Sequence, residues 1–516
     1  MRIRLLVPAL FLLLTSSCST LPPRPEYPVS HAFDDTSDSA LTQSLNQRLA
    51  RHPGKDGFLL LESGLDAFVA RAALASYAGR SIDVQYYLYH RDEVGSVFTA
   101  LLLEAADRGV RVRILVDDMD MGGRDEAIIA FDSHPNIEIR LFNPFSRKTW
   151  RGFQFLTGLG TLTRRMHNKS FIVDNAAAIL GGRNIGNEYF DANPELTFTD
   201  LDVLAIGPVV RQASASFDRY WNSTHAWPVT AVIDARPGES DKQNLLRTLK
   251  QRIASNHVNA WLQSLDNAPL ARQIRQGETW EWGQAVLVVD EPEKIAAARD
   301  ANELHLASQL EPFFEDLHEE LLIVSPYFVP GREGVDFFRQ LRERGIRVKI
   351  LTNSLASSDV GIVHAGYMRY REALLKLGVE LYEMNKLMDT KPRGKSSGTH
   401  GSSRASLHAK TFVLDRQQTF IGSLNLDPRS LYENTEIGLV IDSPAVATEI
   451  ARQFDQLVKQ NAFRLELYTD EDDNELIRWH GYEAGRPVTW EVEPHSSLWQ
   501  RLGVSLLMLL PIESQL

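Results

Sequence analysis

The chain has 516 residues, more than one ordinary hydrophobic core accommodates, so at least two domains are expected. Its 43% hydrophobic and 24% charged residues are typical of a globular protein. The formal net charge of −12 argues against a nucleic-acid partner, because sequence-independent binding of DNA or RNA usually requires a basic surface.

The N-terminus carries the pattern of a secretory signal. Two early arginines precede an apolar run from Leu5 to Leu14, which is too short for a helix to cross the ~30 Å hydrocarbon core of a bilayer. Small residues then lead to Cys18, as at a bacterial lipoprotein processing site, although Thr15 stands where that site prefers Leu. We expect residues 1–18 to be a lipoprotein-type signal peptide and Cys18 to be lipidated. The alternative is a buried thiol in an uncleaved anchor.

Cys18 is the sole cysteine, which excludes an internal disulfide framework. The proline-rich residues 19–44 predict a flexible tether to the first domain. We therefore expect a membrane-anchored lipoprotein of the bacterial cell envelope that faces the periplasm. Ser19, which is not Asp, favours the outer over the inner membrane, and both stay open.

The order strand, amphipathic helix, glycine and second strand occurs twice in the chain. The glycine after each helix suits a left-handed C-terminal cap. The order itself predicts right-handed βαβ units in a largely parallel sheet. The first copy comprises residues 82–88, 97–107, Gly109 and 110–116, and the second comprises 321–328, 335–344, Gly345 and 346–351.

A second pattern repeats without a gap. His167-Asn-Lys-Ser-Phe-Ile-Val-Asp174 matches His408-Ala-Lys-Thr-Phe-Val-Leu-Asp415 at an offset of 241 residues (408 − 167). Gly181-Gly-Arg-Asn184 matches Gly422-Ser-Leu-Asn425 at the same offset (425 − 184).

We therefore expect an α/β protein with two homologous domains related by a pseudo-twofold axis. Each domain is expected to be a mixed, largely parallel sheet flanked by helices. The expected segments are a first domain at 45–230, a polar linker at 231–279, a second domain at 280–465 and a C-terminal extension with an apolar tail at 466–516.

The residue types of the repeated motif suit phosphate chemistry. His and Lys lie two apart on an expected strand and so project from one face, where imidazole and ammonium can meet one phosphate. Asp174 and Asp415 would face the other way and are interpreted as supports for the site. The hydroxyl and amide groups expected near the phosphate are those of Ser170, Asn184, Thr411, Ser423 and Asn425.

Two His-x-Lys-x4-Asp motifs, each followed by a Gly-x-x-Asn turn, resemble those of the phospholipase D superfamily, and the resemblance extends over about residues 57–465. It implies a carboxylate after each motif that orients the catalytic histidine. Glu436 fits that place in the second half, and Asp200 or Asp202 in the first. The catalytic set that the resemblance implies is His167, Lys169, Asp174, His408, Lys410 and Asp415.

Within this superfamily the chain is similar to bacterial cardiolipin synthases of the C type. The similarity is carried by Asp83-Val-Gln-Tyr-Tyr87, Arg165-Met-His-Asn-Lys-Ser170, Gly182-Arg-Asn-Ile-Gly186 and Ser406-Leu-His-Ala-Lys-Thr411. It implies a phosphatidyltransferase in which one histidine forms a phosphohistidine while the other protonates the leaving alcohol. We expect His167 to be the nucleophile and His408 the acid and then the base.

No cofactor is indicated, and two ammonium groups are expected in place of a metal, since no cluster has metal-ligand spacing. The implied partners are a membrane and glycerophospholipids, with phosphatidylglycerol as acceptor and a second lipid, such as phosphatidylethanolamine, as donor. Hydrolysis to phosphatidic acid, a nuclease and a non-enzymatic lipid-binding protein stay open as alternatives.

Two further segments have open interpretations. The apolar run Leu502–Leu510 is too short to span a bilayer, so it lies at the interface, covers an apolar surface or packs in the core. Residues 391–395 form a basic loop that either guides anionic head groups or is merely solvated.

Overall fold

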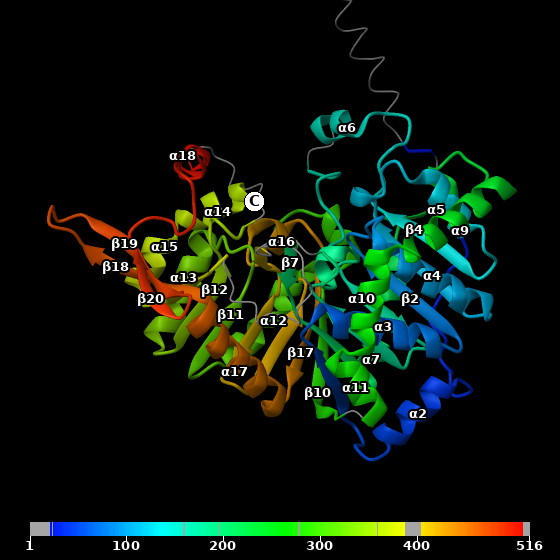
Figure 1. Ribbon diagram of the computed structural model, residues 1–516, viewed down its shortest axis with the longest axis horizontal. Coiled ribbons are helices and arrows are strands. Elements are labelled where there is room, and N and C mark those ends of the chain that lie inside the picture. Colours follow the sequence, from blue (N-terminus) through cyan, green and yellow to red (C-terminus); the bar gives the residue numbers. More distant parts are fainter. Residues whose placement is uncertain are drawn as a thin grey trace, which may run out of the picture.

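Each repeat folds into a sheet flanked by helices, and the two sheets join edge to edge in the computed structural model (Figure 1). The expected signal peptide with Cys18, the basic loop at 391–395 and the end of the apolar tail lie outside the described residues. No helix within the described part is long and apolar enough to cross a bilayer. The structure describes residues 21–22, 24–157, 160–193, 196–276, 279–358, 360–386 and 404–508.

The first half of the sheet ends at β1, which pairs antiparallel with β10 of the second half. The spatial order of its strands is β9 (Ala226–Pro228), β4 (Ile137–Phe142), β3 (Arg111–Asp117), β2 (Ser81–Tyr86), β5 (Ser170–Val173), β6 (Ala177–Gly181), β8 (Asp202–Ile206) and β1 (Asp56–Leu61). The helices of this half are α2 (Ala40–Leu49), α3 (Gly64–Tyr77), α4 (Glu93–Asp107), α5 (Asp125–Asp132), α6 (Arg151–Thr157), α7 (Pro208–Asn222) and α8 (Val229–Val232).

The second half repeats this order from β10 outward and then adds two strands, β19 and β20. Its spatial order is β10 (Glu281–Val289), β17 (Ile437–Asp442), β16 (Gln418–Gly422), β15 (Thr411–Leu414), β11 (Glu320–Val324), β12 (Arg347–Asn353), β13 (Glu380–Met384), β18 (Ala462–Thr469), β19 (Glu475–Glu483) and β20 (Arg486–Trp490). Its helices are α12 (Leu306–Glu315), α13 (Gly331–Glu343), α14 (Gly361–Met368), α15 (Arg371–Lys376), α16 (Pro428–Tyr432), α17 (Pro444–Asn461) and α18 (Leu498–Leu507).

The expected α/β fold with two homologous halves is confirmed. Within the large sheet, parallel pairing is confined to β2–β3–β4 and to β11–β12–β13. The remaining pairs of the sheet are antiparallel, so the parallel share is smaller than expected. The reason is that each His-x-Lys motif leads into a hairpin, β5–β6 or β15–β16, which adds antiparallel strands beside β2 or β11.

The glycine caps that the sequence predicts are present in both halves. Gly109 follows α4 with φ +92°, and Gly345 follows α13 with φ +82°, both in the left-handed region that glycine adopts without strain. The N–H of the next residue, Val110 or Ile346, bonds back to the carbonyl of Ala105 or Leu341. Each helix therefore ends in a Schellman-type turn that starts the second strand of its βαβ unit.

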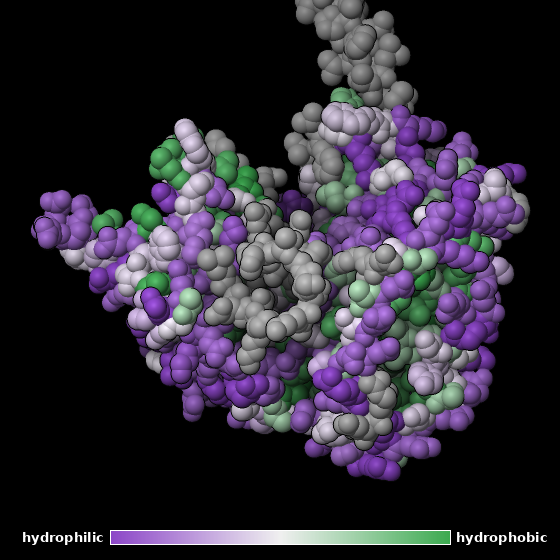
Figure 2. Space-filling view, in the orientation of Figure 1, coloured by the Kyte–Doolittle hydropathy of each residue, from purple (hydrophilic) through white to green (hydrophobic). Residues whose placement is uncertain are grey.

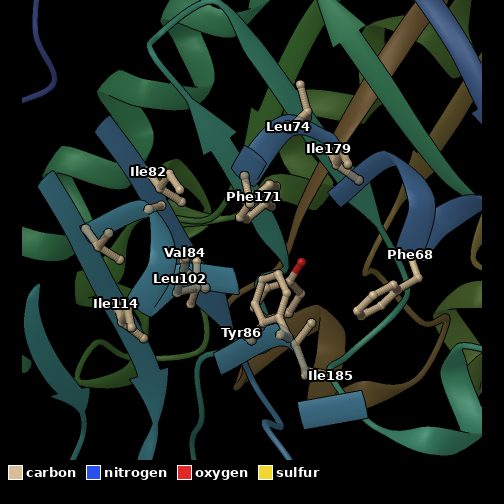
Figure 3. Packing of buried hydrophobic residues seen from close by; sticks show 14 of the residues in the cluster. Phe68, Leu74, Ile82, Val84, Tyr86, Leu102, Ile114, Phe171, Ile179 and Ile185 are labelled. Carbon is tan, nitrogen blue, oxygen red and sulfur yellow. The ribbon is translucent and has the colours of Figure 1, made fainter. Parts of the chain in front are cut away.

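Three large clusters of buried apolar side chains hold the sheet and helices together. In the first half, Phe68 and Leu74 of α3 pack with Val84 of β2 and Ile179 of β6 (Figure 3). The central cluster combines residues of both halves, with Phe217 of α7 and Phe454 of α17 among them. The two halves therefore share a hydrophobic core and are not independently packed domains.

The segments expected as linker and extension are built into the two halves. Residues expected as a linker form α9 (Glu239–Ile253), α10 (Asn256–Asp266) and α11 (Pro269–Gln276), which pack on α3, α4 and α5. Beyond residue 465, β18 continues and pairs with β19, which pairs with β20. The second domain therefore extends past its expected end.

Residues 24–39 form a strap along the first half, which corrects the expectation of a flexible tether. Ser30 N–H donates to Asn222 Oδ1 (3.1 Å), and Ala32 N–H donates to Asp218 Oδ2 (2.9 Å). Thr36 Oγ1 donates to the carbonyl of Asp174 (2.6 Å). The prolines keep the segment out of regular structure, but its polar groups find partners on the domain.

Candidate active site

The two His-x-Lys motifs meet where the halves cross. His167 N–H donates to the carbonyl of Thr435 in the second half (2.8 Å), and His408 N–H donates to the carbonyl of Thr199 in the first (2.9 Å). Strands β7 (Leu196–Thr199) and β14 (Arg404–Leu407) pair in parallel across the same junction. Each motif is therefore held by the backbone of the opposite half, in the reciprocal manner of a pseudo-twofold arrangement.

The histidine rings follow the same crossed pattern. His167 Nδ1 lies 2.8 Å from Glu436 Oε2, and His408 Nδ1 lies 2.6 Å from Asp200 Oδ2. A carboxylate at Nδ1 favours the tautomer with hydrogen on Nδ1 and leaves the Nε2 lone pair available. The carboxylate predicted after each motif is thus contributed to the histidine of the other half.

Asp200, and not Asp202, lies against a histidine. Asp202 pairs with the buried Arg71 (Nη2 to Oδ2, 2.9 Å) and accepts from the N–H of Arg183 (3.2 Å). It therefore braces the first half, and the alternative of Asp202 as the orienting group is corrected.

Asp200 and Glu436 stand in different surroundings. Burial raises the pKa of Glu436 to about 7, and Ser423 Oγ donates to its Oε2 (2.5 Å). Burial also disfavours the charged form of Asp200, but the adjacent His408 and then Lys410 lower its pKa below the usual value. Asp200, the carboxylate paired with His408, is therefore ionised at neutral pH. Glu436, the carboxylate paired with His167, titrates near neutrality.

A glycine in the first half stands where the second half has Ser423. A Cβ at Gly182 would lie 2.3 Å from Asp200 Oδ1, closer than real Cβ contacts. Because Gly182 has no side chain, Asp200, which is shorter than glutamate, can approach the backbone there. At the equivalent place in the second half, the hydroxyl of Ser423 lies against Glu436.

Both lysines act on both histidines. Burial, then the charges of Lys169 and Lys410, lowers the pKa of His167 well below 6.5. Burial and Lys410 lower the pKa of His408 to about 4, against the opposing effect of Asp200, and Lys169 adds to the lowering. Lys169 Nζ donates to the His167 carbonyl (2.5 Å), and Lys410 Nζ donates to the carbonyl of His408. The charges of Lys169 and Lys410 therefore affect the pKa of both His167 and His408.

Aromatic rings pack against the side chains of both histidines. The Tyr87 ring lies edge-on to His167 at 5.0 Å, and Lys169 Nζ lies 5.7 Å from the centre of that ring. Tyr189 and Phe198 contact the His408 ring at 5.2 and 5.1 Å. Tyr87 belongs to the segment Asp83–Tyr87 that carries the family similarity, whereas sequence reasoning missed Tyr189 and Phe198, for which no periodic signal exists.

Asp174 and Asp415 lie away from the histidines, at the far ends of β5 and β15. Asp174 accepts from the N–H groups of Gly79, Arg80 and Ser81 (2.8–2.9 Å). Asp415 accepts equivalent bonds from residues 318–320 at the start of β11 (2.8 Å). Both have positive φ, 54° and 51°. The expected place of Asp174 and Asp415 in the catalytic set is therefore corrected. Each side chain binds the backbone at the amino end of the neighbouring strand, β2 or β11, because its own strand directs it away from the site.

The other polar groups expected at the phosphate take several places. Ser170 Oγ donates to Gln85 (3.3 Å) within the sheet. Asn184 is engaged at both ends, accepting from Leu88 N–H (3.1 Å) and donating to Tyr189 (3.0 Å). Thr411 Oγ1 and Asn425 Oδ1 are buried and have no hydrogen-bond partner among the described residues.

The arrangement is suited to an anionic phosphoryl group. Two imidazoles supply a nucleophile and a proton carrier, and the amino groups of two buried lysines can stabilise charge on the non-bridging oxygens. Burial lowers the pKa of Lys169 well below its ordinary value, and an anionic phosphoryl group beside it would raise that pKa again. Among the described residues, no group of three or more His, Cys, Asp or Glu side chains is arranged to hold a metal ion.

Known proteins are similar to this chain in sequence. The family described as "Cardiolipin synthase, PLD-like domain" matches residues 72–221 and 314–458, and each segment contains one His-x-Lys motif. The chain is 41% identical over 465 residues to cardiolipin synthase C of Escherichia coli (strain K12), covering 90% of this chain and 97% of that protein. It is 26% identical over 403 residues to cardiolipin synthase B of Salmonella typhi, covering 78% of each.

A solved structure is similar in fold. The phosphatidylserine synthase of Haemophilus influenzae Rd KW20 has a TM-score of 0.54 at 15% identity, with 82% of this chain and 91% of that chain covered. That likeness concerns the fold, and the family is shown by the two matched segments and by the identity across nearly the whole of a relative. The chain belongs to the phospholipase D-like family of enzymes, in its cardiolipin synthase group.

Proposed function

We propose that this chain is a phosphatidyltransferase of the cardiolipin synthase type that works through a phosphohistidine. The observation that carries the proposal is the pair of crossed contacts, His167 with Glu436 and His408 with Asp200, which face one shared group of two lysines. The relatives named above give the substrate class, glycerophospholipids.

In the first step, Nε2 of His167 attacks the phosphorus of the donor lipid. An N–P bond forms, the P–O bond to the donor alcohol breaks, and His408 gives its proton to the departing oxygen. Lys169 and Lys410 stabilise the charge on the non-bridging oxygens.

The unequal carboxylates support this division of roles. The ionised Asp200 stabilises a protonated His408, which suits an acid. Glu436, with a pKa of about 7, stabilises an imidazolium less, which suits a histidine that must stay neutral to attack.

In the second step, His408 removes the proton from a glycerol hydroxyl of phosphatidylglycerol. That oxygen attacks phosphorus, the N–P bond breaks, and cardiolipin and free His167 result. Phosphatidylglycerol or phosphatidylethanolamine serves as donor, and water in place of the acceptor gives phosphatidic acid.

The proposal places the enzyme on the membrane that holds its substrates. The sequence supports a lipid on Cys18, since a short apolar run and small residues precede this only cysteine, and a periplasmic location in the bacterial envelope. No metal or cofactor enters the proposed steps.

One incubation tests the reaction. Full-length protein is mixed with vesicles of labelled phosphatidylglycerol, with and without phosphatidylethanolamine, and the lipids are separated. Labelled cardiolipin is the expected product. Phosphatidic acid alone would replace transfer with hydrolysis, and no product in either mixture would contradict the proposed function.

A further inference from the structure

Helix α18 exposes an apolar stripe to solvent. Val504 faces inward and packs with Leu355 and Ala365. On the outward side, Trp499 is 80% exposed and Leu506 is 66% exposed. The stripe consists of Leu498, Trp499, Leu502 and Leu506, which lie on one side of the helix because they follow a spacing of three to four residues.

The stripe lies on the side of the molecule that carries the active site. Leu355, under α18, lies two residues beyond the end of β12. Asn353, the last residue of that strand, exchanges hydrogen bonds with the backbone of Leu407 (3.0 Å each), next to His408. Figure 2 shows hydrophobic side chains gathered over α18, beside a hollow of the surface.

A second exposed aromatic residue belongs to the first half. Trp150 is 77% exposed and directly precedes α6. Arg151 ties this segment to Asp118 (3.0 Å) just beyond β3, and the neighbouring Asp117 accepts from the N–H of Met166 (2.9 Å), beside His167. Figure 1 shows α6 and α18 on either side of α16 and β7, so Trp150 and the stripe lie on opposite sides of the place where the two halves cross.

The start of the described chain reaches the same side. Arg24 donates to the carbonyls of Ser223 (2.8 Å) and Ala226 (3.3 Å), and Ala226 pairs with Phe142, the last residue of β4. Cys18 precedes Arg24 by six residues, so the chain between them spans at most about 20 Å. A lipid on Cys18 would therefore enter a membrane that faces this side.

We propose that the stripe on α18 and Trp150 insert into the surface of a phospholipid bilayer and hold the crossed histidines over it. The inference rests on the proposed function, which draws two lipids from one membrane. Apolar side chains that cost free energy in water gain it at the acyl boundary, and tryptophan favours that interface. Insertion from both halves would orient the crossing of the halves, with its two histidines, toward the lipid head groups.

Site-directed labelling tests the contact in the full-length protein. Leu502→Cys is labelled with an environment-sensitive fluorophore and mixed with vesicles of phosphatidylglycerol and phosphatidylethanolamine, some of whose acyl chains carry a nitroxide quencher. We expect quenching by the nitroxide lipid. Tyr77→Cys is the matched control, since Tyr77 is 67% exposed but lies at the end of α3 just before the amino end of β2, and it should stay unquenched. Wild type carried through the labelling gives the background from Cys18.

Two results would overturn the proposal. One is a Leu502→Cys label that aqueous iodide reaches equally with and without vesicles. The other is a label that becomes shielded without vesicles as the protein concentration rises, because the stripe would then bind a second copy of the chain.

Activity gives an independent readout. The variant with Leu498, Trp499, Leu502 and Leu506 all changed to Ser should lose about tenfold or more of its transfer rate on vesicles, since the lost burial weakens binding. Its rate on monomeric short-chain phosphatidylglycerol should stay that of the wild type. Equal loss on both substrates, or none on vesicles, would contradict a docking role. If the wild type acts on neither substrate, the proposed function fails, and the labelling result still decides the surface.

Discussion

At the scale of single residues, Asp200 and Glu436 follow equivalent threonines in the two halves, but their side chains differ in length and surroundings. The shorter Asp200 sits against Gly182, and Glu436 sits against the hydroxyl of Ser423. The neighbouring charges lower the pKa of the first, and burial raises that of the second. The duplicated motif has therefore diverged in the groups that set the chemistry of its histidines.

The histidine roles predict different failures. His167→Ala should abolish transfer and hydrolysis and yield no trappable phosphoenzyme, because the attacking nitrogen is lost. His408→Ala should slow turnover on lipids by about 10²–10⁴-fold, the usual contribution of an acid or base. It should still form a phosphoenzyme from a nitrophenyl ester, whose leaving group needs no acid. Rapid quenching with labelled substrate measures both, and a phosphoryl group found on His408 in the wild type would reverse the assignment.

Asp200 and Asp202 provide a matched pair of substitutions. Asp200→Asn should reduce kcat strongly with little change in the melting temperature, because it removes the charge that supports protonated His408. Asp202→Asn should instead lower stability by about 3–5 kcal/mol, since the buried Arg71 loses its partner. Thermal unfolding and steady-state kinetics on both variants separate the roles, and the opposite pattern would return the orienting role to Asp202.

The lowered histidine pKa values predict an acidic optimum for kcat/KM, which reports the free enzyme. Attack requires neutral His167, and departure requires protonated His408, whose pKa is about 4. Above that pKa the protonated fraction falls about tenfold per pH unit. Activity should therefore be greatest below pH 6.5 and decline toward alkaline pH. The kcat profile should extend to higher pH, because the bound phosphodiester's negative charge raises the pKa of His408. A kcat/KM maximum above neutrality would contradict this account.

At the scale of elements, Asp174 and Asp415, which end the two motifs, each accept hydrogen bonds from the backbone at the start of β2 or β11. Asp174→Ala and Asp415→Ala should each lower the free energy of unfolding by about 1–3 kcal/mol, because partly buried backbone N–H groups lose their acceptor. Residual kcat should stay near that of the wild type once the protein is folded. Urea unfolding and kinetics at low temperature measure the two effects, and a full loss of kcat in stable protein would restore these residues to the catalytic set.

The repeated βαβ units were predictable because each element carries a local signal. Gly109 and Gly345 mark helix ends, and the apolar runs before and after them form β2, β3, β11 and β12. The crossed carboxylates were not predictable, since they depend on the pairing of β7 with β14 between the halves. Asp200 and Asp202 also share an extended face, so periodicity cannot separate them.

At the scale of the whole molecule, the site exists only where the two halves cross. Each histidine takes its backbone acceptor and its carboxylate from the opposite half. The shared central core, with Phe217 and Phe454, keeps the halves in register. Duplication therefore produced an enzyme whose halves are similar in fold and mutually dependent in chemistry.

The last prediction concerns how this molecule is attached. Because Cys18 is the only thiol and follows a short apolar run, metabolic labelling with a fatty acid should mark the wild type. Cys18→Ala should lose the label and either leave the membrane fraction on washing or accumulate as unprocessed precursor. Thr20→Ala, two residues further on, should keep the label and is the matched control. Absence of the label from the wild type would show that Cys18 carries no lipid, and the exposed apolar side chains would then bind the membrane alone.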